Sequence, residues 1–363
     1  MTTNVMANYS YGEDCFKEIP SVLATYRIQS IAFVGGKRAL DSSEAEVRSI
    51  LEEANIKVTG SFVYGTDSTQ SNIDKLVANP QVQAADAILG FGGGKALDTA
   101  KMVAKELGKN SFTIPTICSN CSAGTAIAVV YNDDHSFLRY GYPESPLHIF
   151  INTRIIAQAP SKYFWAGIGD GISKAPEVER ATLEAKTNKL PHTAVLGQAV
   201  ALSSKEAFYQ FGEQGLKDVE ANLASRAVEE IALDILISTG YASNLVNQPD
   251  FYYNSCHAHA HAFYYGTTAI QRQGEFLHGV VVAFGVLVLH AYFNELEELE
   301  KVARFNKSLG LPTTLADVSL SEKDIPKIVE IAMTTNEYKN TPFDPKMFAQ
   351  AILAADAFGQ TLA

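Results

Sequence analysis

The sequence predicts an amino-terminal α/β domain over residues 1–160 and an all-helical domain over residues 161–363. Short β-rich runs alternate with helical patterns up to about residue 160, which is typical of a parallel sheet covered by helices on both faces. After Pro160 the strand patterns nearly vanish, and long stretches carry helical periodicity instead. A length of 363 residues also suits two domains of ~150 residues each, and we expect an active-site cleft between them.

Six runs rich in β-branched and aromatic residues predict the strands of the first domain. They occupy residues 30–34, 57–64, 87–89, 112–114, 126–131 and 148–151. Amphipathic patterns between them predict helices at residues 43–54, 71–78 and 96–107. In the second domain, helical periodicity covers residues 194–211, 218–239 and 326–335. The apolar stretch 279–293 predicts a buried helix, although periodicity alone does not separate it from a strand.

The composition excludes several classes of function. Hydrophobic residues make up 47% of the chain and charged residues 19%, which is globular composition and excludes disorder of the whole chain. The formal net charge of −11 disfavours binding to DNA, RNA or anionic lipid, because the protein and these partners would repel each other. We therefore expect small molecules and further protein subunits as partners.

The sequence also predicts a cytoplasmic protein. The longest apolar run, residues 279–289, is well short of the ~20 residues that a membrane-spanning helix needs. Residues 1–14 lack the basic and apolar regions of an export signal. Four cysteines are too few for a disulfide framework in a chain of this length, so we expect a reduced environment.

The sharpest local pattern is a glycine-rich turn that includes Gly92, Gly93 and Gly94. It follows the predicted strand 87–89 and opens the predicted helix 96–107, as in Rossmann-like folds. Glycines let the backbone approach a pyrophosphate closely, and the amides at a helix start attract its charge. Lys95 could add a direct positive charge. The alternative is a plain turn, because the pattern is neither a P-loop nor the usual dinucleotide fingerprint.

A second group of residues has the chemistry of metal ligands. Asp170 lies in a Gly-Ile-Gly-Asp-Gly run, His257, His259 and His261 alternate with alanine, and His278 follows 17 positions later. One carboxylate and two imidazoles with an open position form a normal catalytic site for a divalent metal. Taken singly, each histidine is more often an ordinary packed or surface residue, and a His-Ala-His-Ala-His run can also bind metal adventitiously. The residue types alone do not choose the ligands.

Several islands of sequence, in one order along nearly the whole chain, carry a family resemblance. They are residues 90–101, 114–117, 131–133, 159–160, 167–170, 276–279, 282–285 and 310–315. With them the chain resembles the iron-containing (group III) alcohol dehydrogenase superfamily, and most closely its glycerol dehydrogenase-like branch. The loop 118–123 is similar to that of the hydroxycarboxylate dehydrogenases within this branch.

The resemblance implies that Asp170, His261 and His278 hold Zn²⁺ or Fe²⁺ and form the catalytic centre. His257 and His259 then fall outside the metal shell. Family members often carry another histidine where this chain has Tyr264, so a proton relay at this position is in doubt. The metal would act as a Lewis acid that lowers the pKa of an alcohol, while a nicotinamide accepts or donates hydride.

The resemblance also implies that the first domain binds NAD(P)(H). The cofactor-binding residues that it indicates are Gly36, Lys37, Gly92, Gly93, Gly94, Lys95, Asp98, Thr116, Ser119, Thr125, Ile127 and Tyr131. NAD-specific relatives often have an acidic residue after the strand 30–34, where it binds the ribose hydroxyls. This chain has Gly36, Lys37 and Arg38 there instead, which predicts that NADPH is tolerated or preferred. The alternative is that both cations simply begin a solvated helix.

The substrate prediction depends on Cys121, which stands where glycerol dehydrogenases carry an aspartate that contacts a glycerol hydroxyl. Without this carboxylate, a small 2-oxo acid or 2-hydroxy acid is favoured over glycerol. Lys174 and Arg139 are conceivable partners for a substrate carboxylate, or else ordinary surface charges. Thiol redox chemistry at Cys118 and Cys121 is a weak alternative, because the pair does not stand at the start of a helix.

The predicted function is therefore a metal-dependent, NAD(P)-linked oxidoreductase that interconverts a small alcohol and its carbonyl compound. The main alternative is a glycerol dehydrogenase proper. A lyase similar to dehydroquinate synthase is less favoured, because that chemistry needs several cationic groups near the metal. A catalytically silent cofactor-binding protein is disfavoured by the intact ligand positions. We also expect a homo-oligomer.

Overall fold

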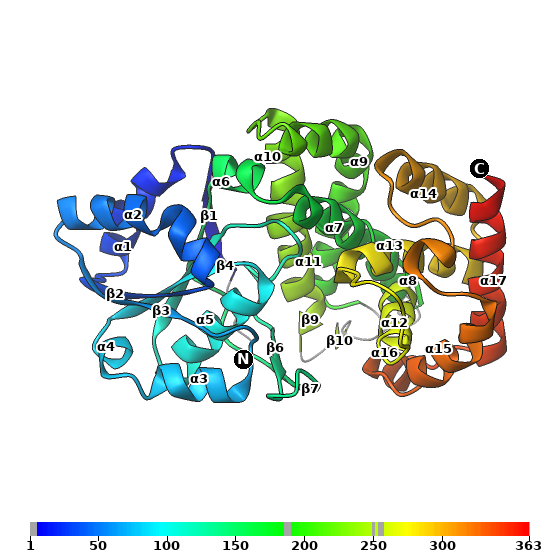
Figure 1. The fold of residues 1–363 in the computed structure, drawn as a ribbon, viewed down its shortest axis with the longest axis horizontal. Coiled ribbons are helices and arrows are strands. Elements are labelled where there is room, and N and C mark those ends of the chain that lie inside the picture. The colour runs from blue at the N-terminus through cyan, green and yellow to red at the C-terminus, as the bar shows by residue number, and fades with distance from the viewer. Residues whose placement is uncertain (1–5, 185–189, 249–250, 253–257, 363) are drawn as a thin grey trace. The chain divides into compact units, whose positions relative to one another are not determined.

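The computed structural model describes residues 6–184, 190–248, 251–252 and 258–362 (Figure 1). The chain divides into two compact units. The first unit comprises Met1–Phe164 and Lys217–Asn244, and the second comprises Trp165–Leu216 and Leu245–Ala363. The division of the sequence into domains at residues 160 and 161 stays a prediction.

The first unit contains a six-stranded parallel sheet with the strand order β1-β8-β5-β4-β2-β3. Its strands are β1 (Asn8–Tyr11), β2 (Ser30–Gly35), β3 (Lys57–Val63), β4 (Ala87–Gly92), β5 (Asn110–Pro115) and β8 (His148–Ile151). The predicted parallel sheet is thus confirmed, and five of its six strands coincide with predicted runs. Strand β1 was not predicted, because it is short, largely exposed and lacks an apolar run.

Helices cover both faces of this sheet, as the buried strands require. Along β2, Ile31 and Phe33 belong to one apolar core, and Ala32 and Val34 belong to another. The first core includes side chains of α1 (Ile19–Thr25) and α2 (Lys37–Glu53). The second includes side chains of α3 (Gln70–Val77) and α5 (Gly94–Glu106), with α4 (Pro80–Gln83) on the same face. Figure 1 shows these two layers of helices on either side of the strands.

One predicted strand has a different partner from the one expected. Strand β6 (Ala128–Tyr131) does not join the parallel sheet but pairs antiparallel with β7 (Phe137–Gly141). The turn between them contains His135 in a left-handed conformation, with φ of 68°. The periodicity of a strand reports its exposure but not its partner, so placing residues 126–131 in the main sheet was wrong.

The remainder of the described chain is mostly helical, as predicted. Its helices are α6 (Thr153–Gln158), α7 (Ser161–Gly171), α8 (Lys174–Glu184), α9 (His192–Glu220), α10 (Arg226–Leu233), α11 (Thr239–Val246), α12 (His259–Thr267), α13 (His278–Tyr292), α14 (Leu296–Leu309), α15 (Ile325–Ala332), α16 (Asn336–Asn340) and α17 (Pro345–Thr361). Asn247–Gln248 and Phe251–Tyr252 form a short antiparallel pair, β9 and β10. No helix of the described residues is long and apolar enough to cross a bilayer.

Helix α13 is the centre of the second unit. Every residue from Gly279 to His290 is buried, which explains why the sequence shows a continuous apolar run and no polar face. Two of its glycines permit close approach of other helices. A Cβ atom at Gly279 would lie 1.9 Å from the backbone oxygen of Ala166 in α7. One at Gly285 would lie 2.4 Å from the backbone oxygen of Ala260 in α12, so only glycine permits both contacts.

Candidate functional site

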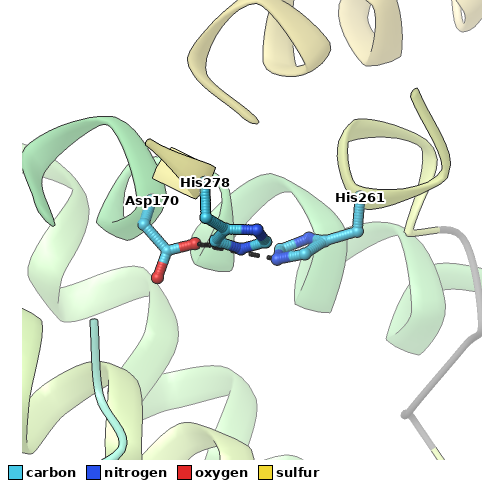
Figure 2. Close-up of side chains that lie close together, drawn as sticks. All are labelled: Asp170, His261 and His278. Atoms are coloured by element: carbon cyan, nitrogen blue, oxygen red, sulfur yellow. Dashed lines mark ion pairs between the residues drawn. The ribbon is translucent and has the colours of Figure 1, made fainter. Parts of the chain in front are cut away.

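Three predicted metal ligands converge in the second unit. Asp170 lies near the end of α7, His261 in the first turn of α12, and His278 at the first residue of α13. Figure 2 shows the three side chains pointing toward one another from these helices. One Asp170 oxygen lies 3.1 Å from Nε2 of His278 and 3.7 Å from Nε2 of His261. The close packing of α7 and α12 against α13 brings the ligands together.

The geometry of these three side chains suits one cation. One ligand atom from each residue lies within 4.8 Å of the other two. Ligands ~2.1 Å from a tetrahedral metal lie about 3.4 Å apart, which is the scale of the separations here. Among the described residues, no other group of three His, Cys, Asp or Glu side chains meets this criterion. One carboxylate and two imidazoles leave a fourth position for a substrate oxygen.

The electrostatics of the cluster also favour a cation. Burial raises the pKa of the Asp170 carboxyl, but the hydrogen bonds and charges of His261 and His278 outweigh it and hold this pKa well below its usual range. Burial lowers the pKa of His261, but the charge of Glu177 and hydrogen bonds with Asp170 and Glu177 raise it to about 10. A cation that binds at neutral pH must therefore displace a proton from His261.

Glu177 is a site residue that sequence reasoning missed. It lies in α8, it is 1% exposed, and each of its carboxylate oxygens lies 3.0 Å from Nδ1 of His261. A hydrogen bond at Nδ1 directs Nε2 toward the metal and increases its basicity, as in other carboxylate–histidine–metal arrangements. Glu177 and His261 are 84 positions apart, and no spacing rule connects them. Only the folded chain reveals the pair.

The remaining histidines and Tyr264 have other environments. His259 is buried against the rings of Tyr292 and Phe293, and it is not one of the three clustered ligands. His257 lies outside the described residues. The ring of Tyr264 packs edge-on against His278, with ring centroids 4.2 Å apart. Burial raises the pKa of Tyr264, so its phenol stays protonated at neutral pH.

The sheet topology of the first unit indicates a dinucleotide site. Strand β2 lies between β3 and β4. The chain therefore adds β3 on one side of β2 and then crosses over to add β4 and β5 on the other side. In open parallel sheets, ligands bind at such a switch point, beyond the carboxyl ends of the strands. Strand β2 ends there at Gly35, Gly36 caps the following helix α2, and β4 ends at Gly92. The amide of Gly36 donates to the carbonyl of Phe91 at 3.3 Å, so the two turns are adjacent.

The glycine-rich turn has the expected local structure. Gly92 has φ of +140°, a conformation that L side chains rarely adopt, and Gly93 caps α5, whose first residue is Gly94. The amides of this first helical turn can face an anion. Lys95 instead forms an ion pair with Asp67 at 2.8 Å, so its predicted contact with a pyrophosphate would compete with this pair.

The other predicted cofactor residues lie near these turns. Thr116 is buried, and its amide donates to the carbonyl of Gly92 at 3.1 Å. Ser119 and Ile127 are half-buried, and the hydroxyl of Thr125 donates to the carbonyl of Ile127 at 3.3 Å. The ring of Tyr131 lies 5.2 Å from the ammonium of Lys95. Contact of these residues with a cofactor stays a prediction, as it does for Asp98, which is buried.

Lys37 is exposed at the first residue of α2 and pairs with Asp41, one helical turn later, at 2.5 Å. Arg38 beside it is also exposed. Both side chains thus remain available to a 2′-phosphate, although Asp41 offsets part of the charge of Lys37. A preference for NADPH stays a prediction.

The candidate substrate residues have different environments. Cys121 is half-buried, Lys174 is 9% exposed, and Arg139 donates to Gln70 at 2.7 Å. Burial of Lys174 and the bond of Arg139 to Gln70 make neither residue a plain surface charge. Burial also raises the pKa of the Cys118 thiol far above its usual range, which suppresses the thiolate that redox chemistry would need. The role of Cys121 in substrate binding stays a prediction.

Comparisons with known proteins indicate the family of the chain. A model of the iron-containing alcohol dehydrogenase family matches residues 7–147. A glycerol dehydrogenase from Escherichia coli is 32% identical over 340 residues, which are 90% of this chain and 89% of that protein. Hydroxycarboxylate dehydrogenase A from Escherichia coli is 27% identical over 327 residues, which are 89% of this chain and 87% of that protein.

A solved structure has the same fold. The crystal structure of a probable glycerol dehydrogenase from Sinorhizobium meliloti matches with a TM-score of 0.82 and 26% sequence identity. The match covers 99% of this chain and 100% of that chain. Identity above 30% over most of two chains, together with a shared fold, confirms the resemblance seen in the sequence. The chain belongs to the iron-containing alcohol dehydrogenase superfamily, within its glycerol dehydrogenase-like branch, and is an oxidoreductase of that family.

Proposed function

We propose that the protein is an NAD(P)-linked dehydrogenase that needs one divalent metal ion and interconverts a small alcohol and its carbonyl compound. The observation that carries this proposal is the convergence of Asp170, His261 and His278 at separations that one cation can bridge. Zn²⁺ and Fe²⁺ both suit a carboxylate with two imidazoles. The glycine turns at the switch point of the sheet support a dinucleotide as the second component.

The residues of the second unit would prepare the site for this chemistry. A divalent ion there supplies a Lewis acid for the substrate oxygen, and a nicotinamide supplies the hydride chemistry. Asp170 provides the negative charge that holds the cation, and His261 and His278 complete the ligand set. Glu177 accepts a hydrogen bond from Nδ1–H of His261, so the proton stays on Nδ1 and Nε2 is left as the ligand atom. Tyr264, against the ring of His278, limits the space around this ligand.

The proposed substrate is a small 2-hydroxy acid and its 2-oxo acid. Cys121 is uncharged, so it would not repel a carboxylate, and it offers no carboxylate acceptor for a polyol. The relative named hydroxycarboxylate dehydrogenase A supports this class of substrate. Glycerol is the second candidate, and the 32% identical glycerol dehydrogenase supports it.

A coupled screen tests both substrate classes. Purified protein would be offered 2-oxo acids, aldehydes and polyols with NADH, NADPH and their oxidised forms, in the presence of Zn²⁺, Mn²⁺ or Fe²⁺. We expect turnover that a chelator abolishes and metal restores. Higher kcat/KM for glycerol than for every 2-hydroxy acid would reject the preferred substrate, and turnover that survives complete removal of metal would reject the proposed centre.

Two variants test the metal ligands directly. Asp170→Asn and His261→Ala should lose at least about 1,000-fold in kcat/KM, since a missing ligand removes the cation on which transition-state stabilisation depends. Metal content measured by mass spectrometry should fall in parallel, while circular dichroism shows a folded protein. Wild-type activity in either variant would contradict the assignment.

The proposal also includes a reduced cytoplasmic setting and a homo-oligomer. Among the described residues, Cys15 and Cys118 are buried and form no disulfide, which supports the setting. Val195 and Leu196 on α9 are 49% and 44% exposed, and apolar surface of this kind supports a contact with another subunit.

A further inference from the structure

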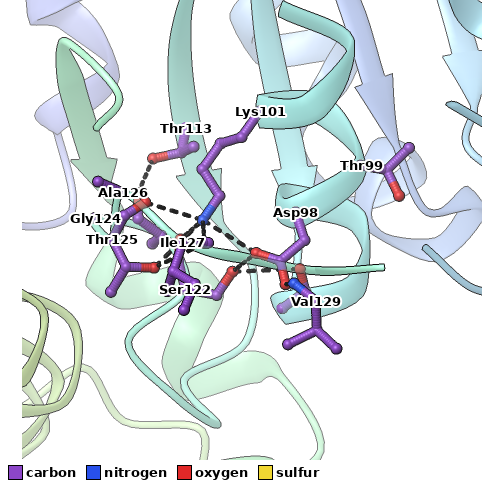
Figure 3. Close-up of polar contacts among 12 residues, drawn as sticks. Asp98, Thr99, Lys101, Thr113, Ser122, Gly124, Thr125, Ala126, Ile127 and Val129 are labelled. Carbon is purple, nitrogen blue, oxygen red and sulfur yellow. Dashed lines mark hydrogen bonds and ion pairs between the residues drawn. The ribbon is translucent and has the colours of Figure 1, made fainter. Parts of the chain in front are cut away.

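An irregular segment of the first unit, residues 119–127, carries Ser119, Thr125 and Ile127, three of the cofactor-binding residues that the family resemblance indicates. It connects β5 to β6 without helix or strand, so its backbone groups cannot bond one another in a regular ladder. Buried backbone groups need other partners, because each unpaired one destabilises the fold. In this segment, buried side chains from other elements provide those partners (Figure 3).

The central side chain is Lys101, which extends from α5 and has no exposed surface. Its ammonium donates to the carbonyl oxygens of Ser122 at 2.8 Å, Thr125 at 3.1 Å and Ile127 at 2.7 Å. An ammonium has three N–H donors in a compact arrangement, so three carbonyls spread over six residues converge on one group. The positions of these three backbone groups are therefore fixed relative to α5.

Asp98, one turn earlier on α5, completes the network. Its carboxylate lies 3.0 Å from the ammonium of Lys101 and neutralises this buried charge. The same carboxylate accepts the hydroxyl of Ser122 at 2.5 Å and the amide of Val129 at 3.0 Å. The ion pair thus binds both the beginning of the segment and the start of β6.

Two neutral side chains bind the middle of the segment. Thr113 of β5 donates to the carbonyl of Ala123 at 2.8 Å. Asn244 accepts from the amide of Ala126 at 2.8 Å and donates to the carbonyl of Gly124 at 3.0 Å. These bonds hold the middle against the sheet and α11, whereas the ion pair of Lys101 and Asp98 connects the segment to the helix that starts at the glycine-rich turn.

We infer that Lys101, with Asp98, is a positioning residue for the cofactor: it fixes the nicotinamide-facing segment to the helix whose first amides would face the pyrophosphate. Lys101 lies in the same run as the glycines, but its ammonium points into the carbonyl network and not toward the helix start. It therefore acts through the segment and does not bind phosphate. This inference rests on the proposed function, a dehydrogenase with a nicotinamide cofactor, and adds that residues 119–127 lie beside the nicotinamide.

The helix geometry explains why one residue can have this effect. Gly94 begins α5, and Lys101 lies two turns later on the same rigid helix. The hydroxyl oxygen of Ser122 also lies 3.3 Å from the carbonyl oxygen of Gly94, so the segment contacts the glycine-rich turn itself. Any shift of the segment relative to α5 would change the distance between the pyrophosphate amides and the nicotinamide-facing residues.

The test uses three variants of the full-length protein. Lys101→Met keeps the length of the side chain and removes the charge and all three donors. Asp98→Asn with Lys101→Met removes both charges, so it contains no unpaired buried charge that could prevent folding. Lys105→Met is the matched control, because Lys105 lies one turn later on α5 and is exposed.

The measurements separate the two halves of the cofactor. Binding of NADH, NADPH and ADP-ribose would be measured by calorimetry, since ADP-ribose has the pyrophosphate but no nicotinamide. Amide hydrogen exchange would report the order of residues 119–129 in the absence of cofactor. Zinc binding would serve as a control for the second unit.

For Lys101→Met and the double variant we expect NADH and NADPH to bind on the order of ten- to 100-fold more weakly, and kcat to fall on the order of 100-fold, as for other misplaced positioning groups. ADP-ribose and zinc binding should change less than about three-fold, exchange at Ala126 and Val129 should become faster, and Lys105→Met should resemble the wild type. Equal weakening of NADH and ADP-ribose, or unchanged NADH binding in the double variant, would overturn the inference. If the wild-type protein binds neither nicotinamide nucleotide, the proposed function itself fails.

Discussion

At the scale of single residues, the candidate metal centre depends on a carboxylate that is not a ligand. Glu177 is buried and bonds Nδ1 on the far side of the His261 ring as well as the backbone amide of His261, so we expect its effect on a cation to pass through this imidazole. A neutral residue there would leave the ring less basic and free to rotate. The distinction between a ligand and its supporting carboxylate can be measured.

Replacement of Glu177 by alanine should weaken zinc binding about ten- to 100-fold, since other supporting carboxylates have effects of this size. Glu177→Gln should retain part of the affinity, because one amide oxygen can still accept from Nδ1. Competition with a chromophoric chelator measures both values. The control is Glu179→Gln on the same helix, which should bind zinc as the wild type does. Unchanged affinity in Glu177→Ala would show that the hydrogen bond has no role in metal binding.

The predicted preference for NADPH also depends on two side chains. Lys37 and Arg38 follow the turn where an acidic residue would exclude a 2′-phosphate, but Asp41 already pairs with Lys37. Replacing both cations with alanine should raise KM for NADPH about ten-fold, equivalent to 1.4 kcal/mol, and KM for NADH less than two-fold. Steady-state kinetics with both cofactors decide the matter, and equal effects on the two would exclude a role in selection.

At the scale of elements, glycine contacts between helices set the ligand geometry. Gly279 follows His278 directly, and an added Cβ there would lie 1.9 Å from a backbone oxygen of α7 and 2.9 Å from Cβ of Asp170. The backbone atoms of a packed helix cannot move aside as the end of a flexible side chain can. The same helix thus carries one ligand and controls how closely a second ligand approaches it.

Gly279→Ala should therefore force α7 and α13 apart and lower zinc affinity at least about 100-fold, because ligand atoms must lie within a few tenths of an ångström of their positions. It should also destabilise the protein by roughly 1–3 kcal/mol, which is typical of overpacking. Gly240→Ala in α11 is the control, since a Cβ at this helical glycine meets other atoms only at 3.6 Å or beyond. Zinc titration and urea unfolding measure both quantities, and full zinc affinity in Gly279→Ala would refute the packing argument.

The local elements could largely be predicted from the sequence. The strand–glycine–helix pattern predicted β4, the turn at Gly92–Gly94 and α5, because each step depends on neighbouring residues alone. The continuous apolar run predicted α13 for the same reason. The choice of Asp170, His261 and His278 among several candidates needed the family resemblance, since residue types and spacing did not select two ligands among the histidines.

The features that the sequence did not reveal all depend on distant partners. The pairing of β6 with β7, the bond between Glu177 and His261, and the carbonyl network of Lys101 join residues whose local patterns look ordinary. Lys101 would be read as a surface residue of an amphipathic helix, yet its side chain is fully buried. Only tertiary structure distinguishes such a lysine from its exposed neighbour Lys105.

At the scale of the whole molecule, two buried groups of the first unit give opposite contributions to acid stability. Burial lowers the pKa of His148 from 6.5 to about 4, although the charge of Glu18 opposes this. Between pH 6.5 and 4 the imidazole of His148 is therefore protonated in the unfolded chain but not in the folded chain. The free energy of unfolding falls as the pH decreases through this range. Burial raises the pKa of Asp234 from 3.8 to about 6, so its contribution is present at low pH and is lost as the pH rises through 6.

Two substitutions separate these contributions. The stability advantage of the wild type over His148→Asn should shrink by about 1.4 kcal/mol for each pH unit as the pH falls from 6.5 to 4. Its advantage over Asp234→Asn should shrink by a similar amount per unit as the pH rises from 4 to 6. Urea unfolding at several pH values gives the difference in free energy of unfolding between the wild type and each variant. Titrating groups that both proteins share contribute equally and cancel in this difference. Differences that do not vary with pH would show that these two groups titrate alike in both states.

The three candidate ligands all lie in one compact unit, and this bears on how metal binding and nucleotide binding can be measured. Asp170, His261 and His278 all belong to the second unit, whereas the glycine turns belong to the first. Metal loading and nucleotide loading can therefore be titrated as separate equilibria, each without the other component. Any change in zinc affinity caused by saturating nucleotide would be a coupling free energy, and reciprocity requires the same change in nucleotide affinity when zinc is added first.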